Sequence, residues 1–173
     1  PQDLVFRLNL CTVSEFSEQG QMLDYCAGHI STEQAREILH RLRKELKDQN
    51  LELICGLQYR HLLVQRNGLE APESGLEINP PHDILNQSLH SALQTYAQSP
   101  LLWDFLQESA SILARPWNQT QANALWPWGQ GGALHLLDFQ EHFQLKGAFI
   151  SAVDLIKGLA RACGLQVLEV PGA

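Results

Sequence analysis

The chain has 173 residues, of which 45% are hydrophobic and 18% are charged, and its formal net charge is −7. This length and composition are sufficient to bury a core and argue against disorder. Acidic and basic residues are interspersed, so the sequence lacks the basic face that a nucleic-acid backbone requires. It also lacks a run of roughly 18 apolar residues and a signal-peptide pattern. We therefore expect a cytoplasmic protein that binds neither nucleic acid nor a membrane.

Four cysteines are widely spaced along the chain, at Cys11, Cys26, Cys55 and Cys163. They form no Cys-x-x-Cys pair and no dense framework, so reduced thiols are favoured over a disulfide or a zinc site. The chain begins at Pro1 and enters an extended pattern within a few residues. This start suggests a piece of a longer protein.

Hydrophobic periodicity predicts strands and helices in alternation. From Leu4 to Cys11 apolar residues recur with a period of two, which places Arg7 and Asn9 together on the opposite face of a strand. Capping signals begin two helices, at Ser31 and at Ser99. The predicted elements are a strand over 4–11, a helix over 31–48, strands over 51–57 and 59–66, a loop over 70–81, a helix over 99–115, a short helix over 138–143, a strand over 147–151, a helix over 153–163 and a strand over 165–170.

The last three of these elements form a strand, helix and strand unit, which favours a parallel strand pair. We therefore predict one α/β (α+β) domain, in which a mixed sheet of about four to five strands packs with three to four helices.

Two tryptophans, a proline and three glycines lie within Ala124–Gly132. Because Pro127 lacks a backbone donor and Gly129 permits a positive φ, we expect a rigid aromatic loop here. Trp126 and Trp128 would either stack on a ligand or anchor the loop in the core.

Several polar residues have functional and structural interpretations side by side. Arg7, Asn9, Arg60 and His61 stand on predicted strands, where an arginine fork can grip a carboxylate or a phosphate; surface ion pairing is the alternative. The stiff Pro80-Pro81 segment leads to His82 and Asp83, a pair suited to proton transfer or anion binding, or to a structural loop.

His135, Asp138 and His142 have a spacing compatible with a metal site on a helix. A solvated helix face is the favoured interpretation, because no further ligand supports a metal. The sequence contains no phosphate loop, no Gly-x-Ser-x-Gly elbow and no evident nucleophile.

Taken in order, a set of segments resembles the archaeal-type cofactor-independent phosphoglycerate mutases, which belong to the alkaline phosphatase superfamily. The resemblance covers nearly the whole chain. The segments are Phe6–Leu10, Asp24–Ile30, Tyr59–His61, Pro80–Asp83, Ala122–Gly131, Lys146–Gly158 and Val170–Ala173.

This resemblance implies that residues 1–173 are a single domain inserted into a phosphatase-like core, over whose substrate the domain closes. In the family a metal-activated serine of the core takes the phosphoryl group from 3-phosphoglycerate and returns it to the other hydroxyl. Two divalent metal ions, of the manganese or zinc and magnesium type, are expected in that core and none in this chain, which alone is expected to be inactive. The substrate-binding candidates carried over by position are Arg7, Asn9, Arg60, His61, His82, Asp83 and Trp128.

The chain departs from the mutase pattern where cations are expected. Tyr25, Cys26, His29 and Trp128 stand where arginine is usual in the archaeal mutases. The loop after Asn118 is shortened and lacks an arginine, for which Arg115 is a potential substitute. These departures resemble a largely bacterial branch. Alternative functions are therefore a homoserine kinase-like phosphotransferase of the same superfamily and a stand-alone module that binds a small molecule.

Overall fold

The computed structural model describes residues 2–46, 50–134 and 136–170 of the chain. Contacts divide it into two compact units, residues 1–132 and 133–173. The first unit contains the five-stranded sheet, and the second contains a two-stranded sheet. Each unit is described by itself. The predicted α/β architecture with a sheet of four to five strands is confirmed.

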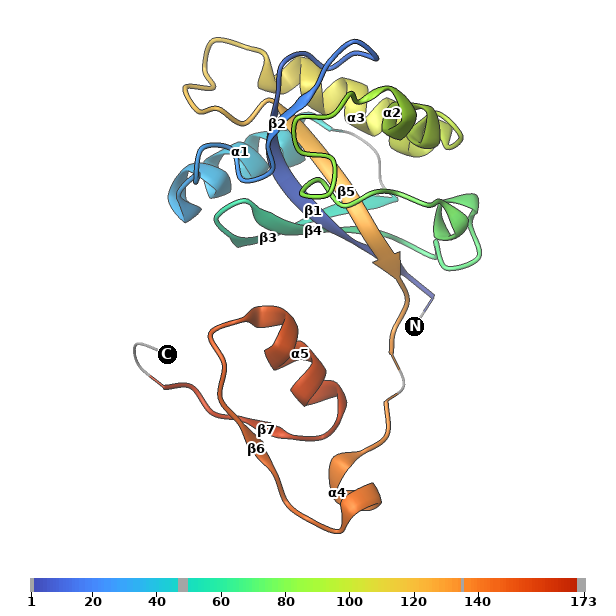
Figure 1. Cartoon of the computed structure of the whole chain (residues 1–173), viewed down its shortest axis with the longest axis vertical. Coiled ribbons are helices and arrows are strands. Elements are labelled where there is room, and N and C mark those ends of the chain that lie inside the picture. Colours follow the sequence, from blue (N-terminus) through green and yellow to red (C-terminus); the bar gives the residue numbers. More distant parts are fainter. Residues whose placement is uncertain (1, 47–49, 135, 171–173) are drawn as a thin grey trace. The chain divides into compact units, whose positions relative to one another are not determined.

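In the first unit, helices pack with a largely antiparallel sheet in which β1 is central (Figure 1). The strands follow the order β2-β1-β4-β3, and β5 pairs with the edge of β1 that lies opposite β4. The elements are β1 (Leu4–Val13), β2 (Met22–Asp24), α1 (Thr32–Glu45), β3 (Leu51–Leu57), β4 (Arg60–Gln65), the 3-10 turn η1 (Pro72–Gly75), α2 (His90–Tyr96), α3 (Pro100–Leu113) and β5 (Ala124–Gly131).

The two capping signals in the sequence mark the starts of α1 and α3. Ser31 accepts a hydrogen bond from the backbone of Gln34, whose side chain bonds back to the backbone of Ser31. Ser99 caps α3 by accepting from the backbone of Leu102. These bonds satisfy amides that a helix leaves free in its first turn. The predicted helices over 31–48 and 99–115 are thus confirmed with the slightly shorter bounds Thr32–Glu45 and Pro100–Leu113, and residues 47 and 48 of the first prediction lie outside the described part.

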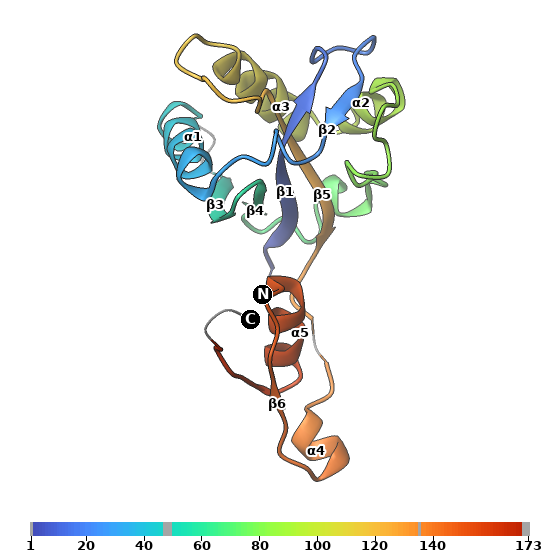
Figure 2. The ribbon, with the colours of Figure 1, turned by 60° about the vertical axis from the view of Figure 1, so that its left-hand side comes forward.

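Strand β1 separates two different environments. Its residues Leu4, Phe6, Leu8 and Leu10 are buried in the core, to which α1 and α3 contribute their apolar faces. In Figure 2, α1 and the segment that contains α2 lie on opposite sides of β1. Trp126 of β5, which lies opposite Asn9 on the second face, is also buried and meets the Tyr96 ring of α2. The sheet therefore has cover on both faces, and that cover determines which side chains of the second face remain accessible.

The aromatic segment 124–132 is a strand for most of its length and not the loop that its composition suggested. Pro127 lies opposite Leu8 in an antiparallel pairing, and its carbonyl accepts a hydrogen bond from the Tyr96 hydroxyl, at 2.6 Å. The carbonyl of Pro127 faces away from β1. The backbone nitrogen of a strand residue points to the same edge as its carbonyl, so the nitrogen of Pro127, which carries no hydrogen, also faces away from β1. Among the described strands β5 pairs with β1 alone, so a proline costs no ladder hydrogen bond here. Gly129, at φ +58°, lies in a bulge where the register of β1 and β5 shifts.

A buried carboxylate ties η1 to the sheet and to α3. Glu73 accepts hydrogen bonds from Gln65 Nε2, at 3.0 Å, and from the Ser99 hydroxyl. Burial opposes the charge, but these hydrogen bonds favour it more strongly, so the pKa of Glu73 lies below its ordinary value. Gln130 adds a bond from β5 to the carbonyl of Glu73, at 3.1 Å. The loop predicted over 70–81 is thus fixed to three elements.

The second unit consists of a short helix and a strand, helix and strand unit. Asp138 caps the first helix by accepting from the backbone of Glu141, and Ala148 and Gln166 pair in parallel. The predicted parallel crossover is confirmed. The elements are α4 (Phe139–Phe143), β6 (Ala148–Phe149), α5 (Asp154–Ala162) and β7 (Gln166–Val167).

Candidate functional site

Residues directly opposite one another in antiparallel strands have side chains on the same face of the sheet. The strand register therefore shows which of the candidate residues share a face. Arg7 lies opposite Trp128, and Asn9 lies opposite Arg60. All four therefore lie on the face of the sheet opposite the β1 core residues, as predicted for Arg7 and Asn9. This face is the starting point of the candidate site.

Arg7 is held against the Trp128 ring. Its guanidinium carbon is 4.8 Å from the ring centroid, a cation–π geometry. Both residues are half-buried. Stacking orders the long arginine side chain before any anion binds, which reduces the entropy that binding would otherwise cost. Trp128 thus acts as a support for a cation.

Asn9 orients Trp128 through its side-chain amide, whose nitrogen and oxygen both have hydrogen-bond partners in the protein. Its Nδ2 donates to the carbonyl oxygen of Tyr25 and its Oδ1 accepts from Trp128 Nε1, each at 3.0 Å. Asn9 is 5% exposed. Because both ends of the amide have protein partners, Asn9 positions the indole and has little remaining capacity to contact a ligand.

The segment after β2 is fixed by the Asp24 carboxylate. Asp24 accepts hydrogen bonds from the backbone N–H of Cys26, at 2.9 Å, and of Gly28, at 2.6 Å. Burial opposes the charge on Asp24, but bonds from Cys26 and Gly28 outweigh it and lower the pKa of this carboxyl. Ala27, Gly28 and His29 adopt positive φ values of 51°, 69° and 56° around it. This anchored turn presents the Tyr25 carbonyl to Asn9.

Aromatic rings connect the two arginines. His82 meets Trp128 and Tyr25 edge to face, with ring centroids at 5.3 and 6.0 Å. Tyr25 meets Tyr59 in the same manner, at 5.9 Å, and the guanidinium carbon of Arg60 is 5.4 Å from the Tyr59 centroid. We call these residues the arginine–aromatic cluster: Arg7, Asn9, Tyr25, Tyr59, Arg60, His82 and Trp128.

Asp83 lies beside this cluster. Its Oδ1 is 3.6 Å from His82 Nε2, and both side chains are exposed. An exposed pair of this kind contributes little to stability. His82 and Asp83 are therefore available to a ligand, and their role stays a prediction.

His61 is separated from the other candidates, because it lies opposite Leu8 and so faces the core. It is 4% exposed, and its Nδ1 accepts from the backbone N–H of Gly56 at 3.1 Å. Among the described residues no hydrogen-bond partner faces its Nε2. Burial, reinforced by the nearby charge of Arg43, lowers the pKa of His61 to about 4. The sequence analysis placed Arg60 and His61 at one site, but the strand register puts their side chains on opposite faces of the sheet.

Arg115, the potential substitute for an arginine in the shortened loop, already has an acidic partner. It forms an ion pair with Glu45 of α1, whose apolar face packs on the core. The shortened loop is instead organised by Asn118, whose Nδ2 donates to the carbonyl oxygens of Leu113, at 2.9 Å, and Ala122, at 2.6 Å. Arg115 is therefore engaged with the end of α1 and not with the arginine–aromatic cluster.

Tyr25 and Tyr59 were not among the residues selected from the sequence. Each lies within a segment that carries the family resemblance, but a tyrosine beside a turn has no spacing that distinguishes a site from a surface. Asp24 was likewise not a candidate, although an Asp side chain often accepts a hydrogen bond from the backbone two residues on, as Asp24 does from Cys26.

A metal site has no support in the described part of the chain, where no group of three or more His, Cys, Asp and Glu residues could hold an ion. His135, one of the three residues of the spacing noted above, lies outside the described residues. None of the described helices is long and apolar enough to cross a membrane.

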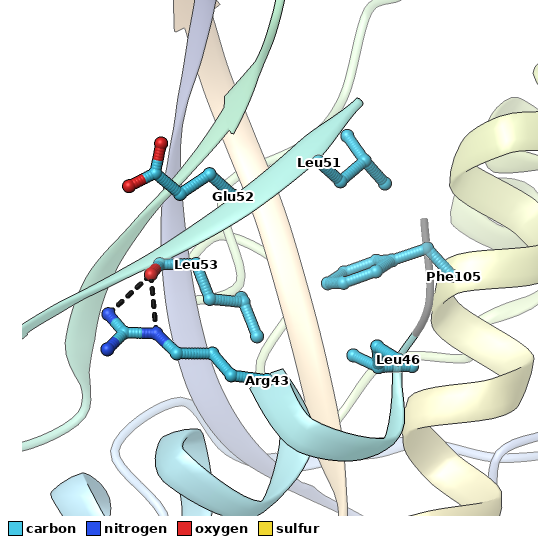
Figure 3. A pocket seen from close by; sticks show the side chains of 6 residues that line it. All are labelled: Arg43, Leu46, Leu51, Glu52, Leu53 and Phe105. Atoms are coloured by element: carbon cyan, nitrogen blue, oxygen red, sulfur yellow. Dashed lines mark hydrogen bonds between the residues drawn. The ribbon is translucent and has the colours of Figure 1, made fainter. Parts of the chain in front are cut away.

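A cavity of about 340 Å³ lies between α1, β3 and α3 (Figure 3). Leu46, Leu51 and Phe105 contribute apolar surface, and Arg43 donates two hydrogen bonds to the Leu53 carbonyl. None of its lining residues belongs to the arginine–aromatic cluster. With its arginine already engaged, this cavity is a weaker candidate for an anion than the cluster.

The site and fold define an α/β domain that presents two aromatic-supported arginines on one face of a sheet. Residues 1–118 match the family described as 2,3-bisphosphoglycerate-independent phosphoglycerate mutase. The chain belongs to this family.

Similar proteins extend the match along the chain. The curated 2,3-bisphosphoglycerate-independent phosphoglycerate mutase of Methanosarcina barkeri is 38% identical over 99% of this chain and 43% of its own length. A probable enzyme of the same name from Geobacter sulfurreducens is 35% identical over 99% of this chain and 44% of its own length. The solved structure of the PH0037 protein from Pyrococcus horikoshii shares the fold, with a TM-score of 0.64 and 20% identity over 99% of this chain and 39% of that chain. The chain thus spans less than half of the curated relatives it matches.

Proposed function

We propose that this chain contains the substrate-capping domain of a phosphoglycerate mutase that interconverts 3- and 2-phosphoglycerate. The observation that carries the proposal is the arginine–aromatic cluster, in which Arg7 and Arg60 share a sheet face and each stacks on an aromatic ring. Two ordered cations suit a small acid that bears both a carboxylate and a phosphate. The name of the matched family supports this substrate class.

The remaining machinery belongs, in this proposal, to a phosphatase-like core in the same polypeptide. That core would supply two divalent metal ions and the serine that carries the phosphoryl group, in a cytoplasmic enzyme. The capping domain would orient the substrate and exclude water while the phosphoenzyme exists. Accordingly, we expect the purified 1–173 chain to show no mutase turnover.

Substitution of Arg60 in the full-length parent tests the proposal. Loss of a charge-assisted contact to an anion costs about 1.5–3 kcal/mol, so Arg60→Ala should lower kcat/KM on the order of 10- to 100-fold. Arg36→Ala, an exposed arginine of α1, is the matched control and should leave turnover unchanged. Equal activity of both variants and the wild type would remove Arg60 from the site.

A phosphotransferase that acts on homoserine or another small alcohol is a second candidate. Trp128 favours it, because this residue stands where arginine is usual in the archaeal mutases and its ring supports Arg7 in place of a further cation. The two reactions differ in their requirement for a donor. Conversion of 3-phosphoglycerate without any added phosphate donor supports the mutase, whereas phosphorylation of an alcohol only with a separate donor supports the transferase.

A further inference from the structure

The second unit leaves most of its large apolar side chains exposed. Among its described residues, Ala160 is the buried hydrophobic one, at 5% exposure, whereas Leu137 is 73% exposed. Soluble domains of any size bury such side chains in a shared core. The other exposed members are Leu134, Leu136, Phe143, Leu145, Ile150, Val153, Leu155, Leu159, Leu168 and Val170.

Its sheet is also incomplete by the usual standards of parallel sheets. Strands β6 and β7 form a parallel pair in which Phe149 lies opposite Val167, and α5 connects them. Parallel sheets are covered on both faces, and a two-stranded sheet alone is at best marginally stable. The pair therefore has an edge and a face that need partners.

Helix α5 has one face engaged and one face free. Lys157 and Arg161, four residues apart, approach the Glu169 carboxylate at 2.8 and 3.9 Å. Leu155 and Leu159 have the same spacing on the opposite side of the helix and are exposed. The charged side thus holds α5 to the segment that follows β7, while the Leu155–Leu159 face is presented outward.

The lengths of the relatives identify an occupant for these surfaces. The chain covers 43% of the Methanosarcina barkeri protein, so a protein of that length has more than half of its residues outside this chain. We propose that the Leu155–Leu159 face and the β6–β7 pair dock on that remaining part, where they extend a parallel sheet as a strand, helix and strand unit. This inference rests on the proposed function and narrows the capping domain to residues 1–132.

Hydrogen exchange in the full-length parent and in the 1–173 chain tests this docking. Amides of α5 should exchange on the order of tenfold or more slowly in the parent, because only there is the Leu155–Leu159 face covered. Amides of α1 and α3, which pack in a core of their own, should exchange equally in both proteins. Equal exchange of α5 in both would overturn the proposal.

Substitutions identify the partner. In the parent, Leu159→Asp should accelerate exchange in α5 and in segments outside 1–173, whereas the equally apolar and exposed Leu57→Asp should not. If Leu159→Asp instead accelerates exchange within residues 1–132, the face packs on the first unit. If α5 protection depends on protein concentration, a second copy covers it. Either result rejects the docking proposed here.

Because exchange is measured without substrate, the result is independent of turnover. A protected α5 in a parent that lacks mutase activity would leave the docking intact and reject the proposed function.

Discussion

Trp126 and Trp128 lie two residues apart on the same face of β5, yet the structure gives them opposite roles. Trp126 is fully buried, meets Tyr96 edge to face at 5.3 Å and donates to the Asn79 carbonyl at 3.0 Å. Trp128 is half-buried and carries Arg7. The difference is the cover that α2 supplies to one end of the face. A shared face therefore does not define a site until the segments that cover it are known.

The largest effect expected is on stability, from Trp126→Ala. Removal of a buried indole leaves a cavity and an unpaired Asn79 carbonyl, at a cost of about 3–5 kcal/mol in the free energy of unfolding of the first unit. Urea denaturation of residues 1–132 followed by circular dichroism measures it. Trp128→Ala is the control and should cost clearly less. Equal losses would contradict the distinction between the two tryptophans.

The next effect concerns His61, whose burial lowers its pKa to about 4 from an ordinary 6.5. Below pH 6.5 His61 is protonated in the unfolded chain, whereas in the folded chain it stays neutral down to about pH 4. The free energy of unfolding therefore falls as the pH falls from 6.5 to about 4. The loss is about 3 kcal/mol. His61→Asn keeps an acceptor for the Gly56 N–H but does not titrate. Denaturation of both proteins at pH 7 and 4.5 should show the smaller pH dependence in the variant; parallel profiles would contradict the buried, neutral histidine.

Arg7 lies beside Trp128, at the end of the sheet face that is left uncovered, and its substitution tests whether that end binds the substrate. In the full-length parent, Arg7→Ala should lower kcat/KM roughly 10- to 100-fold, with little change in stability. Arg7→Lys should recover only part of the loss, because lysine keeps the charge but lacks the planar fork that stacks on Trp128. Steady-state kinetics and thermal unfolding together provide the test. Full recovery by lysine would show that charge alone matters.

The smallest effect expected is that of Trp128→Phe. The ring and its contact with Arg7 remain, but the hydrogen bond from Nε1 to Asn9 is lost, at a cost of about 1 kcal/mol. KM should rise a few-fold and kcat should change little, since Arg7 loses order and not charge. An unchanged KM would show that Asn9 does not position the ring.

Local patterns were sufficient wherever one segment carries the whole signal. The alternation in β1, the caps at Ser31 and Ser99 and the parallel crossover of the second unit all appear in the structure. Helix α2 was missed because its N-cap, Leu89, has no side-chain bond to reveal a start. Strand β5 was mistaken for a loop because proline and glycine are unfavourable in strands on average.

By itself, the sequence determined that Arg7 and Asn9 share a face, because side chains alternate along any strand. Only the tertiary structure decided that Arg60 joins them while His61 enters the core, since the register of β1 with β4 sets which residues lie opposite one another. It also decided that Pro127 belongs to a strand, because an edge position leaves its missing donor without consequence. Both outcomes depend on pairing between segments far apart in the chain, which no local pattern records.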